Sequence, residues 1–140
     1  MARVKLNLPD KFVFTTQIPV RITDINYGGH LGNDALLSII HEARLQFLTY
    51  YGYSEIDIEG RSIIMADVAI VYKAEVFYGD TLQVDIAVTD LQNMGCDLIY
   101  RVTNAAKGTE VARVKTGIVF FDYDARKPVA MPDGFRKHFQ

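Results

Sequence analysis

The chain has 140 residues, 49% hydrophobic and 23% charged, with a formal net charge of −2, a composition typical of a single globular domain over residues 1–140. The scattered lysines and arginines argue against a nucleic-acid-binding protein, and no segment is long and apolar enough for a signal peptide or a membrane span. Because Cys96 is the single cysteine, no intrachain disulfide can form, and we expect a soluble cytoplasmic protein in which Cys96 is a small core residue.

The first predicted element is a strand over residues 12–23, which are rich in aromatic and β-branched side chains. Pro19 lacks the N–H group that a central strand needs, so we expect this strand at a sheet edge or a bulge. The strand ends at Asp24. Residues 24–33, with the sequence DINYGGHLGN, are then expected to form a loop punctuated by three glycines.

A long helix is predicted over residues 33–51, because apolar side chains recur there at steps of three and four residues. Asn33 is a suitable N-cap for this helix. Gly52 is placed to end it in a left-handed conformation.

Strand character returns after the helix. Short turn sequences separate four expected strands, over residues 62–76, 81–91, 96–104 and 110–123. Apolar and polar side chains alternate over residues 82–89, so that strand has one apolar face. One long helix and about five antiparallel strands define an α+β fold in which the sheet must curl around the helix to cover it.

Several motifs occur together in one order along the chain. They are Asp24, the pair Gly29 and His30, Asn33, the triplet EAR at 42–44, YKAEVFYGDTLQV at 72–84 and VARVKTGIVFFD at 111–122. In these motifs the sequence resembles the 4-hydroxybenzoyl-CoA thioesterase-like branch of the hot-dog superfamily, across nearly its whole length. The resemblance implies a hot-dog fold, with one long central helix wrapped by a curled antiparallel sheet, and an enzyme that hydrolyses an acyl-CoA thioester to a free acid and CoA.

The sequence departs from the family's pattern at Asn26, where that pattern has a second carboxylate. In characterised relatives this acid acts as nucleophile or as base for water, and an amide can only orient water or the carbonyl. The resemblance therefore leaves the role of base to Asp24, then His30, then Glu42. Each has a structural alternative, because Asp24 can cap a turn, His30 can hold the loop, and Glu42 can be a solvated charge. His41 is expected to be a surface or interface residue of the helix.

A loop that runs into a helix N-terminus suits thioester cleavage on physical grounds. Attack on the carbonyl creates an oxyanion, and the first N–H groups of the helix near Asn33 lack internal partners and can stabilise that charge. Asn33 is therefore a candidate site residue, and Gly29 is expected to let the substrate approach closely. The sequence has no P-loop ending, zinc motif or serine elbow, so we expect no metal and no cofactor beyond the CoA of the substrate.

The predicted helix and several aromatic residues present more apolar surface than one sheet can cover, so we expect a homodimer or homotetramer. The resemblance implies sheets paired edge to edge and an active site at the dimer interface, with Met65, Asp67 and Val68 near the acyl pocket. The CoA phosphates need surface cations, for which the candidates are Lys73, Arg101, Arg113 and Lys115.

Three other functions stay open. The loss of the acid at Asn26 suggests a non-hydrolytic protein that binds acyl thioesters. Plant-type acyl-ACP thioesterases resemble the same Asn-led loop with a histidine at the position of His30, which suggests an acyl carrier protein as the donor. A hot-dog dehydratase is the least favoured alternative.

Overall fold

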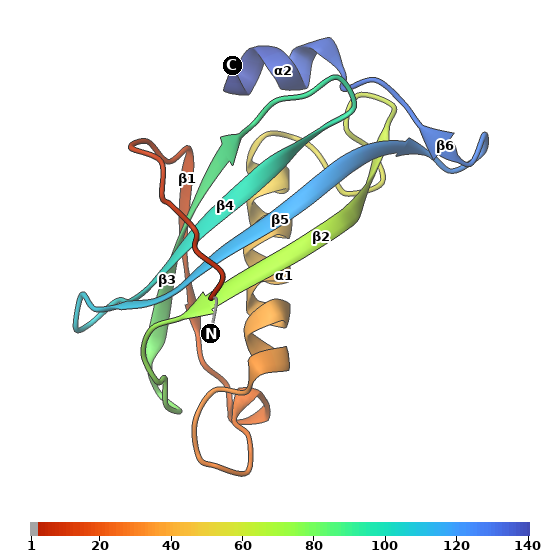
Figure 1. The fold of residues 1–140 in the computed structure, drawn as a ribbon. Coiled ribbons are helices and arrows are strands. Elements are labelled where there is room, and N and C mark those ends of the chain that lie inside the picture. The colour runs from red at the N-terminus through yellow and green to blue at the C-terminus, as the bar shows by residue number, and fades with distance from the viewer. Residues whose placement is uncertain (1–2) are drawn as a thin grey trace.

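A computed structural model describes residues 3–140, and half of them belong to one long helix and a six-stranded antiparallel sheet (Figure 1). The elements in chain order are β1 (Phe14–Pro19), the 3-10 helix η1 (Ile22–Asp24), α1 (Asn33–Tyr50), β2 (Ser62–Tyr72), β3 (Thr81–Thr89), β4 (Gly95–Asn104), β5 (Glu110–Asp122), β6 (Lys127–Pro128) and α2 (Asp133–Phe139). The strands lie in the order β1-β3-β4-β5-β2, and β6 pairs with β5. The expected α+β hot-dog architecture is confirmed, with six strands where about five were predicted.

The core lies between α1 and the sheet, whose strands cross the helix in Figure 1. The buried face of α1 carries Leu36, Ile40, Ala43 and Phe47, spaced four, three and four residues apart and almost fully enclosed. Alternate residues of the central strands meet this face, as period-two side-chain orientation requires. The helical and strand periodicities of the sequence thus specify the same core.

β1 and β2 form the two edges of the main sheet order. β1 is one edge, which confirms the prediction from Pro19, and its pairing with β3 ends at that proline. Residues 22 and 23, predicted as strand, and Asp24, predicted as loop, instead form η1, because the chain turns away once the ladder stops. β2 is the other edge, and no strand among residues 3–140 pairs with its outer side.

The C-terminal elements were not predicted. α2 is only seven residues long, too short for a periodic pattern, and it is held by Phe135, which is fully buried. The Phe135 ring packs against Phe120 and Phe139, with centroids 5.1 and 4.8 Å away. The contact with Phe120 joins α2 to β5, so local propensity carries no trace of it.

Three smaller predictions can be compared with the structure. Gly52 has φ +81° just after α1, as predicted for the end of that helix. Cys96 is buried, and burial, with Asp97 and Asp90 nearby, raises the pKa of its thiol to about 12. Within residues 3–140, neither helix combines the length and hydropathy needed to cross a membrane.

Candidate functional site

The loop between η1 and α1 is closed by its own backbone hydrogen bonds. The Gly32 N–H donates to the Asp24 carbonyl over 3.0 Å, and the Asn26 N–H donates to the His30 carbonyl over 2.9 Å. Gly29 has φ +82°, a conformation that favours glycine, and its N–H donates to the Asn26 carbonyl. The loop therefore has a defined shape despite its glycines.

The Asn26 side chain helps to build this loop. Its Oδ1 accepts a hydrogen bond from the Gly28 N–H over 2.9 Å, which is the local turn that asparagine and aspartate both favour. This contact gives the amide a structural use at the position where the family's pattern has a carboxylate.

Asp24 also has a structural position. Its carboxylate is 5% exposed and accepts hydrogen bonds from the Arg21 N–H at 2.8 Å and from the Arg21 guanidinium at 3.3 Å. These contacts hold η1, the turn that begins the loop. Asp24 does not line the cavity that His30 and Asn33 border, so the structure does not bring the first-ranked base together with them.

The N-cap of α1 is Gly32 rather than Asn33, and no side chain caps this helix end. A Cβ on Gly32 would lie 2.9 Å from Asp34 Oδ1, so a larger residue there requires the Asp34 side chain to move. The first intrahelical bond runs from the Leu36 N–H to the Gly32 carbonyl. The amides of residues 33–35 precede it and have no hydrogen-bond partner within the described chain. An uncapped first turn of this kind attracts negative charge.

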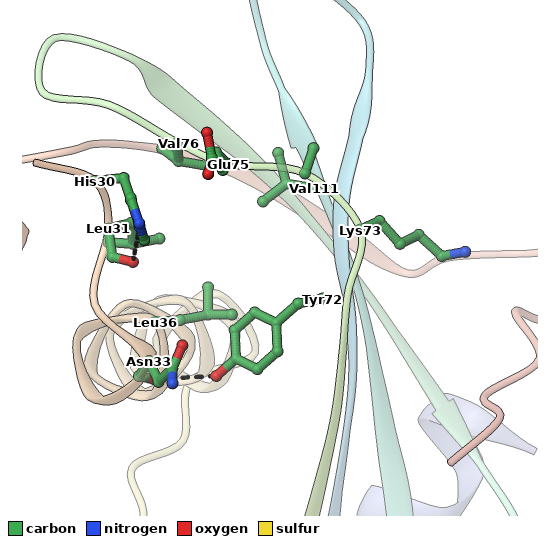
Figure 2. Close-up of a pocket in the computed structure, with 10 residues that line it drawn as sticks. His30, Leu31, Asn33, Leu36, Tyr72, Lys73, Glu75, Val76 and Val111 are labelled. Carbon is green, nitrogen blue, oxygen red and sulfur yellow. Dashed lines mark hydrogen bonds between the residues drawn. The ribbon is translucent and has the colours of Figure 1, made fainter. Parts of the chain in front are cut away.

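A cavity of about 300 Å³ lies beside this helix end (Figure 2). His30 and Asn33 border it from the loop and α1, while Tyr72 and Glu75 border it from the end of β2 and the connection that follows. The Tyr72 hydroxyl donates to the Asn33 carbonyl over 3.3 Å, so a hydrogen bond connects β2 to the first turn of α1 beside the cavity. The His30 ring makes one long contact, 3.5 Å from Nδ1 to the neighbouring carbonyl, so its polar atoms remain available to a ligand.

The cavity therefore combines an imidazole with an uncapped helix N-terminus. Its remaining lining is largely apolar and includes Leu36, Val76 and Val111. A neutral imidazole can accept a proton, and unpaired amides can bind a developing oxyanion. Among residues 3–140 no cluster of three or more His, Cys, Asp or Glu side chains is placed to hold a metal ion.

Glu42 lies elsewhere on α1. Its carboxylate accepts a hydrogen bond from Gln46 Nε2 over 2.9 Å, and it lines a groove between α1 and β1 together with Ile18. The structure thus does not bring Glu42 to the cavity of His30 and Asn33.

The three β2 residues predicted near the acyl pocket divide between the two faces of the sheet. Met65 and Val68 line a second cavity, between α1 and β2. Asp67 faces the other side, where its carboxylate bonds the Lys115 ammonium at 2.7 Å and the Gly117 N–H at 3.0 Å. Those hydrogen bonds from Lys115 hold the pKa of Asp67 below its usual value. Side-chain alternation and a bulge between residues 65 and 67 cause this separation.

Lys73 is the one of the four candidate cations that lines the His30 cavity, although Figure 2 shows its side chain directed away from His30 and Asn33. Its ammonium lies 4.0 Å from the Glu110 carboxylate. The other three cations are held in closer ion pairs, Arg101 with Asp85, Arg113 with Glu110 and Lys115 with Asp67.

One polar network was missed by the sequence analysis. Arg44 is 6% exposed, and its guanidinium donates to Glu55 on one side and to the Tyr100 hydroxyl on the other. The available signal was its spacing, because Arg44 falls four residues after Ile40 and four before Leu48, inside the apolar stripe of α1.

A long helix enclosed by a curled antiparallel sheet, with a glycine loop at the N-terminus of the helix, defines a hot-dog protein. The thioesterase-like superfamily matches residues 20–139, and the chain belongs to this superfamily. No curated protein is similar enough to match the chain.

Several solved structures share the fold. A 1,4-dihydroxy-2-naphthoyl-CoA thioesterase from Synechocystis is 22% identical with a TM-score of 0.81, and the match covers 89% of this chain and 93% of that one. A DHNA-CoA thioesterase from Staphylococcus aureus is 22% identical with a TM-score of 0.78, over 89% and 84% of the two chains. A thioesterase from Thermus thermophilus, solved with coenzyme A and zinc, is 21% identical with a TM-score of 0.76, over 91% and 97%. These similarities establish the common fold.

Proposed function

We propose that the protein is a cytoplasmic enzyme that hydrolyses an acyl-CoA thioester to a free acid and CoA. The observation that carries this proposal is that His30 and the uncapped first turn of α1 border the same cavity. Membership of the thioesterase-like superfamily supports a thioester as the substrate. Water is the second reactant, and no cofactor is needed beyond the CoA that the substrate carries.

In the proposed mechanism the thioester oxygen lies at the amides of residues 33–35, which have no other partner within the described chain. His30 accepts a proton from water as the water oxygen attacks the carbonyl carbon, and the amides stabilise the resulting oxyanion. The carbon–sulfur bond then breaks, and the imidazolium returns the proton to the CoA thiolate. Asp24 and Asn26 hold the loop that positions His30.

We also propose that the enzyme is a homodimer in which the β2 strands of two copies pair. β2 is eleven residues long and has an unpaired outer edge among residues 3–140, and Val68 on it is 46% exposed. Such an edge readily pairs with another strand. Light scattering at micromolar concentration is expected to give twice the chain mass of 15.8 kDa, and a monomeric mass would contradict the dimer.

The alternative of a non-hydrolytic acyl-thioester-binding protein is favoured by one observation. The amide of Asn26 replaces a carboxylate and is already bonded to the Gly28 N–H. If His30 does not accept protons from water, the cavity holds a thioester without cleaving it.

The test is steady-state release of CoA, followed with a thiol reagent, across short, long and aromatic acyl-CoAs and the matching acyl carrier protein thioesters. Wild type is compared with His30→Ala, His30→Gln and Asn26→Asp. We expect turnover by wild type and a loss of about 10²- to 10⁴-fold in kcat in both His30 variants, at an unchanged melting temperature. No turnover by wild type, together with a gain in Asn26→Asp, would establish the binding protein instead. Faster cleavage of carrier protein thioesters would make the donor acyl-ACP.

A further inference from the structure

A second cavity, of about 250 Å³, lies between α1 and β2, about two helical turns beyond the His30 cavity. Its apolar lining comes from Leu37, Ile40, Met65 and Val68, and its polar lining comes from Ser38, His41, Arg44 and Thr116. An apolar passage with a polar wall is an arrangement that fits a ligand with one polar end.

The guanidinium of Arg44 is the charged group of this wall. Its Nε donates to Glu55 over 2.9 Å and its Nη1 donates to the Tyr100 hydroxyl over 3.3 Å. Its Nη2 has no hydrogen-bond partner among the described residues. Among residues 3–140, every fully buried side-chain nitrogen or oxygen has a hydrogen-bond partner. Because Nη2 has none, it is not fully buried and must border open space. Since the Arg44 side chain is only 7% exposed, that space is the cavity it lines.

The guanidinium is held in a fixed orientation. Tyr100 is fully buried, and its hydroxyl also bonds the Thr116 hydroxyl over 2.8 Å. Glu55 uses its two oxygens separately, one for Arg44 and the other for His41 Nε2 over 2.8 Å. The network therefore fixes both Arg44 and His41 beside the same cavity.

Stability alone does not explain the charged network of Arg44 and Glu55. Burying a paired arginine and glutamate commonly gives less stability than apolar side chains of the same volume. Glu55 bonds Nε of Arg44 and Nε2 of His41, which leaves Nη2 of Arg44 as the N–H group that can receive an anion. Arginine recognises carboxylates well, because its planar N–H groups match their oxygens.

The two cavities are aligned along the seam between α1 and β2. From Asn33 to His41 the helix rises about 12 Å, and from Tyr72 to Val68 the strand extends about 13 Å. These two estimates agree on the separation between the cavities. A thioester carbonyl at the first turn of α1 would thus place the far end of an extended medium-length acyl chain at Arg44.

We propose that the second cavity binds the distal end of the acyl group and that Arg44, with His41 and Ser38, selects acyl chains ending in a carboxylate. This inference rests on the proposed thioester hydrolysis and names its substrate class. Arg44 is a specificity residue here, because it contacts the substrate far from the reacting carbonyl.

The first experiment compares kcat/KM for decanedioyl-CoA and decanoyl-CoA, which differ only in the distal carboxylate. Wild type is expected to prefer decanedioyl-CoA by about 10-fold or more, as one charge-assisted hydrogen bond provides. Arg44→Met is expected to abolish that preference, while Arg61→Met, at an exposed arginine outside both cavities, keeps it. Equal kcat/KM values in wild type, or an unchanged preference in Arg44→Met, would overturn the inference.

Two further experiments cover the cases in which Arg44→Met does not fold or wild type shows no hydrolysis. If Arg44→Met does not fold, Ser38→Ala and His41→Gln test the same wall, and each is expected to lower the preference several-fold; no change in either would overturn the inference. If wild type cleaves no acyl-CoA, the proposed hydrolysis fails, and calorimetric binding of free decanedioate against decanoate tests the cavity by itself. Tighter binding of decanedioate that disappears in the Arg44 or Ser38 variant supports the site, and equal affinities refute it.

Discussion

The N-terminal end of α1 differs from its C-terminal end in what covers it. At the N-terminal end Gly32 provides no capping side chain, the next three amides lack partners within the described chain, and His30 borders an open cavity. At the C-terminal end Tyr51 and Phe47 pack against Phe139 of α2, with ring centroids 5.0 and 5.6 Å away. In Figure 1 α2 lies at this end of the molecule, opposite the glycine loop.

The difference indicates a division of roles along one helix. Aromatic packing at the sealed end buries a large apolar area and stabilises the fold. The open end leaves polar groups unpaired, at some cost in stability, where the proposed function places the substrate. Mutations at the two ends should therefore affect stability and activity separately.

The largest expected effect lies at the sealed end. Phe135→Ala removes a fully buried ring that contacts Phe120 and Phe139, and it should lower the free energy of unfolding by about 3–5 kcal/mol. Urea unfolding measures this change, and kcat per folded molecule should stay close to that of wild type. A large loss of kcat in the folded fraction would show that the two ends are coupled, contrary to the division of roles.

A smaller effect is expected from Asp24→Asn at the open end. The substitution replaces charge-assisted hydrogen bonds to Arg21 by neutral ones, which should cost about 1 kcal/mol of unfolding free energy. Turnover should fall much less than in His30→Ala, because Asp24 does not line the cavity. A 100-fold loss of kcat at an unchanged melting temperature would instead identify Asp24 as the base. The sequence analysis ranked Asp24 first among the candidates for that role.

The elements that local sequence specifies were predicted well. The helix was expected over residues 33–51 and spans Asn33–Tyr50, because its apolar period and Gly52 are both local signals. The four later strands were located within a few residues for the same reason. α2 and β6 were not predicted, since their positions depend on contacts with β5 and on Phe135.

The site was predicted less completely than the fold. The glycine loop, His30 and the helix N-terminus were identified from sequence, and they lie together. The separation of Asp24 from His30 was not, because it follows from the turn at Gly29 and the hydrogen bonds from Arg21 to Asp24. The Arg44 network was also missed, because its partners lie 11 and 56 residues away in the chain.

Between the two ends, the Arg44 network should give the fold a modest dependence on pH. Burial opposes ionisation of Glu55, but hydrogen bonds from His41 and Arg44 outweigh it, so the pKa of Glu55 is lower than its ordinary value of 4.5. The folded state therefore binds this proton less readily than the unfolded state. Its contribution to stability is present above pH 4.5 and is lost as the pH falls below that value.

Urea unfolding at pH 6 and pH 4 measures this effect in wild type and in Glu55→Gln. Wild type should lose stability over this interval, and the variant, which cannot titrate at residue 55, should lose less. An equal loss in both proteins would assign the acid sensitivity to other carboxylates.

The smallest expected effect is the reactivity of Cys96, which reports on the sealed end without altering it. The thiol is 5% exposed, and its pKa is raised to about 12 by burial and by Asp97 and Asp90, so little thiolate forms at pH 8. It should react with an aromatic disulfide reagent only after denaturation. Arg136 of α2 lies close enough to influence this thiol, so loosening of α2 in Phe135→Ala should speed the reaction before global unfolding. Equal labelling rates in wild type and Phe135→Ala under native conditions would mean that α2 does not protect this part of the sheet.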